Sequence, residues 1–157
     1  MEDESKIKHI TLVSEVFLTY KTKVNPKDRL RITSSKDAYK VLFDTWNKNS
    51  IEHIEEFKIL ILNRSNAVLG ILSVSKGGIS GTVTDVRIIF QAALKANASG
   101  MIICHNHPSG NASPSESDRR ITQKIKEAGS IMDIQLLDHI IIQPIEGYYS
   151  FADDGIL

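Results

Sequence analysis

Hydrophobic residues alternate with polar ones, or gather in short runs, at several places along the chain, and this pattern predicts β-strands. The predicted strands cover residues 57–63, 67–74, 101–104, 134–142 and 147–151. Turn-forming residues 63–66 separate the first two, which predicts an antiparallel pair in the centre of a sheet. Residues 10–20 also alternate and are expected to form a half-buried strand, followed by a connection over residues 21–31.

Apolar residues recur at three- and four-residue spacing in two other segments, and a capping pattern marks the start of a third, so that three helices are predicted. These helices are expected over residues 35–48, from about residue 84 to a stop at 97–100, and over residues 113–128. In the third helix Ser113 can act as the cap, Pro114 suits the first helical position and Glu116 completes a capping box. Strands and helices thus interleave, which predicts a layered α/β domain with a mixed β-sheet flanked by helices.

The length and composition indicate one folded domain with a short extension. The chain has 157 residues, of which 41% are hydrophobic and 24% charged, so it can bury a core. We expect residues 1–30 to form a strand-like extension that packs on or leads into the domain of residues 31–157. Nineteen basic and nineteen acidic side chains cancel, so DNA association would need a local patch or a partner.

The single cysteine, Cys104, excludes an intramolecular disulfide framework and a cysteine-rich zinc module. Neither a signal peptide nor an apolar run long enough to cross a membrane is visible in the sequence. We therefore expect a soluble, cytoplasmic protein without a membrane partner. The sequence gives no prediction of the oligomeric state.

Residues 104–118 contain a group of side chains that can bind a metal ion. His105 and His107 are two residues apart in an extended segment, so both imidazoles can face one point. Ser115 and Asp118 share one face of the third predicted helix, and the intervening loop can turn that face toward the histidines. Two histidines and one aspartate can hold Zn²⁺ and leave a fourth position for water. From spacing alone, histidines that bind no metal remain an equal alternative.

Hydrolysis at such a metal site also needs a group that accepts a proton from water. Glu55 and Glu56 stand where an apolar strand begins, and either can project beside the metal. Ser115 can stabilise the oxyanion that forms when water attacks a carbonyl group. The alternative for the two glutamates is a solvated strand entrance with no catalytic role.

The complete motif resembles that of the JAMM (MPN+, JAB1-type) metalloproteases. It reads His-x-His-Pro at residues 105–108, then six residues, Ser115, two residues and Asp118. Further matching segments resemble the RadC branch of that family, and the resemblance covers residues 31–157. They are Glu55-Glu56-Phe57, Leu62-Asn63-Arg64, Gly81-Thr82, the run from His105 to Gly110, residues 137–142 and Ser150-Phe151.

This resemblance implies a role for each matching residue. His105, His107 and Asp118 would be the Zn²⁺ ligands, and Ser115 would stabilise the tetrahedral intermediate. Glu56 is the first choice for the general base and Glu55 the second, because a one-residue slip reverses the face of a strand residue. The family also implies a cytidine-deaminase-like layered fold and zinc-dependent hydrolysis of a peptide or isopeptide bond in an unidentified protein substrate.

Other functions stay open as alternatives. One is a non-catalytic metal-bearing binding module in DNA metabolism or repair, and another is a nuclease, suggested by the letters His-Asn-His. Proteins of the RadC branch usually carry a helix-hairpin-helix DNA-binding segment, which residues 1–30 are too few and too strand-like to supply. A zinc deaminase is excluded because its ligands include two cysteines.

Five other residues receive structural interpretations. Cys104 is expected to be a buried thiol, and His9 and His53 are expected to lie on the surface. The pair Asp138-His139 is interpreted as satisfied polar residues near a strand end, with support of the zinc ligands as the alternative.

Overall fold

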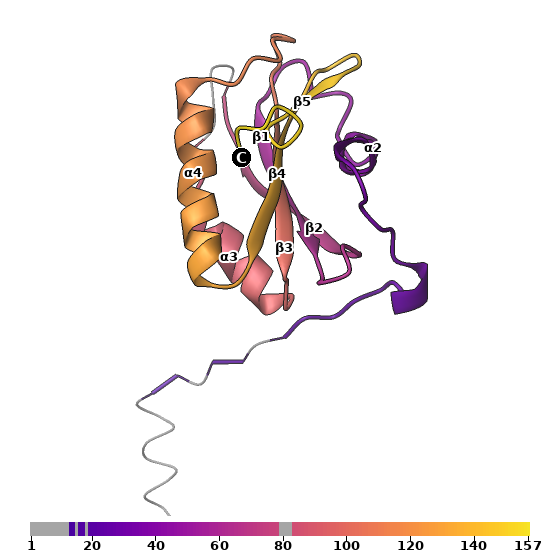
Figure 1. Ribbon diagram of the computed structural model, residues 1–157, viewed down its shortest axis with the longest axis vertical. Helices are drawn as coiled ribbons and strands as arrows, with labels where there is room; N and C mark the ends of the chain where they lie inside the picture. The colour runs from indigo at the N-terminus through magenta and orange to yellow at the C-terminus, as the bar shows by residue number, and fades with distance from the viewer. Residues whose placement is uncertain (1–12, 15, 18, 79–82) are drawn as a thin grey trace, which may run out of the picture.

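The computed structural model describes residues 13–157 except 15, 18 and 79–82. A five-stranded sheet with the order β2-β1-β3-β4-β5 forms its centre (Figure 1). The strands are β1 (Glu56–Leu62), β2 (Val68–Lys76), β3 (Gly100–Asn106), β4 (Gln135–Ile142) and β5 (Tyr148–Ser150). The helices are the short 3₁₀ helix η1 (Pro26–Asp28), α2 (Ser35–Asp44), α3 (Val86–Lys95) and α4 (Glu116–Ile131).

The sheet is mixed, as the sequence predicts. Strand β1 pairs antiparallel with both β2 and β3, whereas β3 and β4 run parallel and are joined through α4. Helices α3 and α4 cover one face of the sheet and α2 covers the other (Figure 1). This arrangement confirms the predicted layered α/β fold with a sheet flanked by helices.

The alternation of side chains along β1 and β3 divides the core in two. Phe57, Ile59 and Ile103 face α3 and α4, and we call this side the α3/α4 face. Leu60 and Cys104 face α2, and we call this side the α2 face. The Cys104 thiol is free and buried, as expected, and burial raises its pKa. Any residue of these two strands can therefore be assigned to a face by its position.

Helix α4 begins later than the sequence predicts. Its N-cap is Ser115, and the capping partner is Asp118, so the expected cap at Ser113 with Glu116 is wrong. The hydroxyl of Ser115 accepts a hydrogen bond from the backbone of Asp118, and the Asp118 carboxylate accepts one from the backbone of Ser115. This reciprocal pair satisfies two backbone donors, which favours the start observed here.

The strand predicted over residues 10–20 is not seen in the part of that segment that the structure describes. Val16 and Phe17 are exposed, and Tyr20 donates a hydrogen bond to the backbone oxygen of Leu69. An alternating sequence fits the period of a strand but does not supply a neighbouring strand to pair with. Residues 10–12, 15 and 18 lie outside the described residues.

Candidate metal centre

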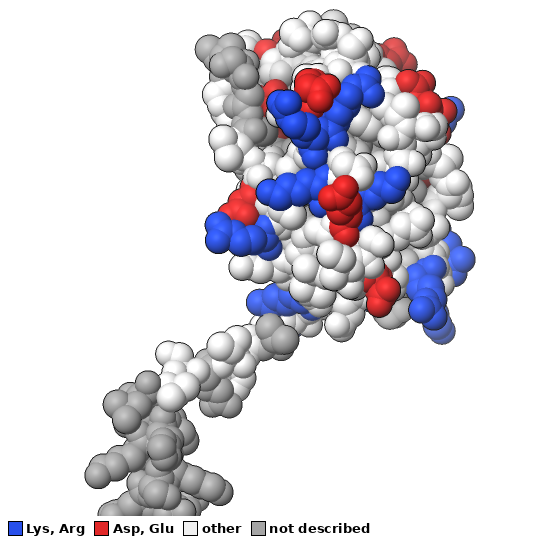
Figure 2. All heavy atoms as spheres, turned by 60° about the vertical axis from the view of Figure 1, so that its left-hand side comes forward, with Lys and Arg blue, Asp and Glu red and all other residues white. Residues whose placement is uncertain are grey.

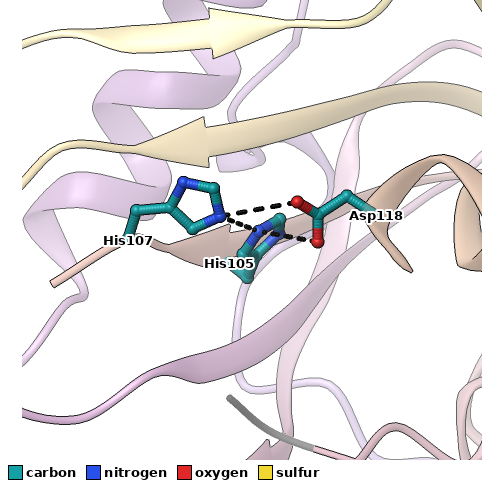
Figure 3. Close-up of side chains that lie close together, drawn as sticks. All are labelled: His105, His107 and Asp118. Atoms are coloured by element: carbon teal, nitrogen blue, oxygen red, sulfur yellow. Dashed lines mark hydrogen bonds and ion pairs between the residues drawn. The ribbon is translucent and has the colours of Figure 1, made fainter. Parts of the chain in front are cut away.

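The end of β3 and the first turn of α4 bring His105, His107 and Asp118 together (Figure 3). The two Nε2 atoms are 2.9 Å apart. Asp118 places Oδ1 3.2 Å from His105 Nε2 and Oδ2 3.5 Å from His107 Nε2. The potential ligand atoms of all three lie within 4.8 Å of one another, so this group can hold a metal ion.

The helix cap fixes the position of the Asp118 carboxylate. Both the backbone nitrogen and the hydroxyl of Ser115 donate to Asp118 Oδ2 at 2.7 Å. Burial raises the pKa of Asp118, but hydrogen bonds that His105 and His107 donate in their protonated forms, together with the Ser115 hydroxyl, outweigh this effect and hold the pKa well below its usual range. The carboxylate is therefore ionised and oriented, as a metal ligand must be.

A backbone carbonyl fixes the tautomer of His107. Its Nδ1 lies 2.6 Å from the carbonyl oxygen of Asn111. Because a carbonyl can only accept, Nδ1 carries the hydrogen and Nε2 of the neutral ring keeps its lone pair. Burial lowers the pKa of His107, but the protonated ring donates to both Asp118 and the Asn111 carbonyl, which raises the pKa more. In the neutral ring the lone pair is on Nε2. His107 thus directs a basic nitrogen at Asp118 and His105.

His105 is more deeply buried than His107 and has a second histidine behind it. Only 1% of His105 is exposed, and its Nδ1 lies 2.8 Å from Nε2 of His139. His139 is completely buried, and burial holds its pKa well below the usual range. Its neighbour Asp138 bonds instead to Ser150, at 2.6 Å. Both residues are satisfied, and His139 is also in direct contact with a candidate metal ligand.

The two candidate bases lie on opposite sides of the sheet. Phe57 and His105 are paired residues of β1 and β3 and share the α3/α4 face. Glu56 precedes Phe57 and therefore points to the α2 face. Glu55 is two residues before Phe57 and just outside β1, so continued alternation puts it on the side of His105. Burial lowers the pKa of His107, and the charge of Glu55 is one of the causes that raise it.

Glu56, the first-choice base, interacts with other residues on the α2 face. Only 1% of Glu56 is exposed, its Oε1 accepts a hydrogen bond from Ser50 at 3.1 Å, and it pairs with the Nζ atoms of Lys76 at 3.6 Å and Lys58 at 3.8 Å. With the sheet between it and His105, Glu56 is badly placed for proton transfer at the candidate metal site. Glu55, the second choice, has the better position, and the catalytic role stays a prediction.

Asn106 is a residue that the sequence reasoning treated only as a spacer between the histidines. It is completely buried, and its Oδ1 accepts a hydrogen bond from the backbone of Glu56 at 2.7 Å. Its Nδ2 donates to the backbone oxygens of Ile51 and Ile54 at 2.7 and 2.9 Å. Asn106 therefore ties the segment that carries Glu55 to the end of β3. Its partners are about 50 residues away in the sequence, so no local pattern could reveal them.

Asn106→Ala should lower the free energy of unfolding by about 3 kcal/mol, because three buried backbone groups would lose their partner. Urea denaturation measures this loss. The matched control is Asn49→Ala, at an exposed asparagine of the preceding loop, which should change the free energy by less than about 0.5 kcal/mol. Equal stability of the two variants would show that Asn106 does not anchor this segment.

The fold is a mixed β-sheet flanked by helices, and two histidines and an aspartate at the end of β3 and the start of α4 can hold a metal ion. This combination is that of a JAB-type domain. A family model described as "RadC-like JAB domain" matches residues 32–156. The chain belongs to this family. The family and the fold are those that the sequence motif predicts.

Bacterial relatives are similar to this chain over part of their length. A "UPF0758 protein" of Flavobacterium johnsoniae is 50% identical over 126 residues, which are 80% of this chain and 53% of that protein. One from Clostridium beijerinckii is 40% identical over 139 residues, 88% of this chain and 59% of the relative. The chain thus spans between about half and two thirds of the length of these relatives.

Proposed function

We propose that the protein is a zinc-dependent hydrolase that cleaves a peptide or isopeptide bond. The observation that carries this proposal is the convergence of two Nε2 atoms and one ionised carboxylate. The side chains of His107 and Asp118 keep 15% and 14% of their surface exposed, so water and substrate can reach them. Family membership supports the same activity without establishing it.

The donor set suits zinc in particular. Two imidazole nitrogens and one carboxylate oxygen are a ligand combination of catalytic zinc sites, which keep one position free. His105, His107 and Asp118 would hold the ion. When bound there, zinc supplies a Lewis acid that makes water a nucleophile near neutral pH and polarises the substrate carbonyl.

Glu55 and Ser115 complete the proposed reaction. The Glu55 carboxylate takes a proton from the attacking water and later gives it to the leaving amine, which is general base and then general acid catalysis. Ser115 is exposed beside Asp118. Its hydroxyl hydrogen turns from Asp118 to the oxyanion, while the backbone nitrogen of Ser115 continues to hold the carboxylate.

A metal-bearing binding module is the second candidate, and the position of Glu56 is the observation that favours it. If the base had to be Glu56, the ligands would be present without a proton acceptor. Nucleic-acid association would use a surface patch, and helix α4 carries four exposed cations, Arg119, Arg120, Lys124 and Lys126. Figure 2, with that side forward, shows acidic side chains interspersed among basic ones. No uniformly basic groove is visible on this face.

Metal removal separates the hydrolase from the binding module. Protein loaded with one equivalent of zinc should cleave members of a random peptide library or an isopeptide-linked lysine model, as detected by mass spectrometry. The same protein treated with a chelator should lose this cleavage and regain it when zinc is restored. Zinc-loaded protein that cleaves neither substrate would favour the binding module, and cleavage unaffected by the chelator would contradict the metal mechanism.

A further inference from the structure

Behind the candidate metal site, a chain of buried hydrogen bonds connects His105 to helix α4. His139 Nε2 lies 2.8 Å from His105 Nδ1, and His139 Nδ1 lies 2.6 Å from the hydroxyl oxygen of Thr122. The His139 ring stacks on Phe151 with centroids 4.7 Å apart. Both ring nitrogens of His139 are therefore engaged, and the ring is packed in one orientation.

The hydrogen bond at the Thr122 end of this series sets the direction of all the others. Thr122 Oγ1 lies 2.5 Å from the backbone oxygen of Asp118, one turn earlier in α4. A carbonyl oxygen cannot donate, so the hydroxyl hydrogen of Thr122 lies in this contact. Thr122 then offers only lone pairs to His139, and His139 Nδ1 must carry a hydrogen.

The same reasoning continues to the metal ligand. His139 is completely buried and has no carboxylate among its hydrogen-bond partners, so its ring is neutral. With a hydrogen on Nδ1, its Nε2 can only accept. His105 must then donate from Nδ1, so the neutral form of this ring has its lone pair on Nε2, the nitrogen that faces Asp118.

We propose that Thr122 and His139 are positioning residues that hold His105 in the tautomer able to bind the metal. This inference rests on the proposed metal site and extends it to residues that touch neither metal nor substrate. His107 reaches the same tautomer through the Asn111 carbonyl. The neutral form of each ring thus carries its lone pair on Nε2, and neither histidine has to change tautomer when the metal binds.

The opposite pair of tautomers shows why the Thr122 hydroxyl determines which nitrogen of His105 carries the hydrogen. If His139 carried its hydrogen on Nε2, it would donate to His105, and the hydrogen of His105 would move to Nε2. That hydrogen would face Asp118 Oδ1, 3.2 Å away, and would block the metal. This reversal requires the Thr122 hydroxyl to leave the Asp118 carbonyl and donate to His139.

Two substitutions at Thr122 test the proposal. Thr122→Val keeps the shape of the side chain and removes the hydroxyl, whereas Thr122→Ser keeps the hydroxyl and removes a methyl group. In Thr122→Val a hydrogen on His139 Nδ1 would be a buried donor without an acceptor, so the ring should move its hydrogen to Nε2. The direction of the hydrogen bond between His139 and His105 should then reverse.

The tautomer of His105 is measured by long-range ¹H–¹⁵N NMR on metal-free, histidine-labelled protein at about pH 9, where imidazoles are neutral. Single substitutions assign the five histidines of the chain. Wild type and Thr122→Ser should show hydrogen on Nδ1, and Thr122→Val should show a shift toward Nε2. Zinc affinity, from competition with a chromogenic chelator, should fall about 10- to 100-fold in Thr122→Val alone.

The result that overturns the proposal is a Thr122→Val protein with the wild-type tautomer and wild-type zinc affinity. A wild-type His105 with its hydrogen on Nε2 would overturn it as well. A loss of affinity equal in the valine and serine variants would assign Thr122 a packing role only. Failure of the proposed function is a separate result, in which wild-type protein binds no zinc or cleaves no substrate. The tautomer of His105 is measured on metal-free protein, so it still tests the roles of Thr122 and His139.

Discussion

Glu55→Gln is expected to remove most hydrolytic activity and to leave metal binding intact. The change preserves the size of the side chain but removes the group that accepts the proton, and loss of a general base costs about 10²- to 10⁴-fold in rate. Glu55 has the required position, on the side of His105 and close enough for its charge to raise the pKa of His107. The measurement is kcat on a cleaved peptide, with zinc content determined on the same sample.

Glu56→Gln is the matched control, one residue further along the chain. Glu56 pairs with Lys58 and Lys76 on the α2 face. Its substitution should lower the free energy of unfolding by about 1–3 kcal/mol, because the buried Lys58 ammonium loses the negative charge that pairs with it. The kcat should stay at the wild-type value. The opposite pattern, with turnover lost in Glu56→Gln and kept in Glu55→Gln, would reverse our assignment of the base.

His107→Ala is expected to abolish zinc binding under conditions in which the wild-type protein retains one equivalent. The substitution removes one of three ligands, so the loss of affinity should exceed the roughly 10- to 100-fold effect of an outer-shell change. Asp118 would at the same time lose the imidazole nitrogen that lies 3.5 Å from its Oδ2. Metal analysis after dialysis and a competition titration measure the effect.

His53→Ala is the control for this second substitution. His53 is exposed in the turn that precedes β1 and lies outside the group of potential metal ligands. Its removal should leave the zinc content unchanged. If His107→Ala and His53→Ala retain the same amount of metal, then His107 is not a ligand and the proposed site is wrong.

Much of the fold could be predicted because the relevant signals are local. The apolar run in residues 57–62 reflects a strand that is buried on both faces, and the spacing in residues 86–96 reflects a helix that is buried on one face. The candidate metal ligands could also be predicted from the sequence, because His105, His107 and Asp118 lie close together in a specific motif. The structure brings together the three residues that the motif singles out.

Other features depend on contacts that no local pattern records. The choice between Glu55 and Glu56 depends on the pairing of Phe57 with His105, and a one-residue change in register reverses it. The partners of Asn106 are backbone atoms about 50 residues away. His139 and Thr122 are 17 residues apart, and each looks like an ordinary polar interruption of its strand or helix.

The three potential ligands come from residues 105–118, whereas Glu55 comes from a separate segment that Asn106 fastens to the same edge of the sheet. In the proposed hydrolase, metal binding and turnover would therefore depend on separate segments. Substitutions in residues 51–55 would leave a protein that binds its metal without turnover, while substitutions in residues 105–118 would remove both properties. Divergence of the first segment alone would leave a metal-binding protein without hydrolytic activity.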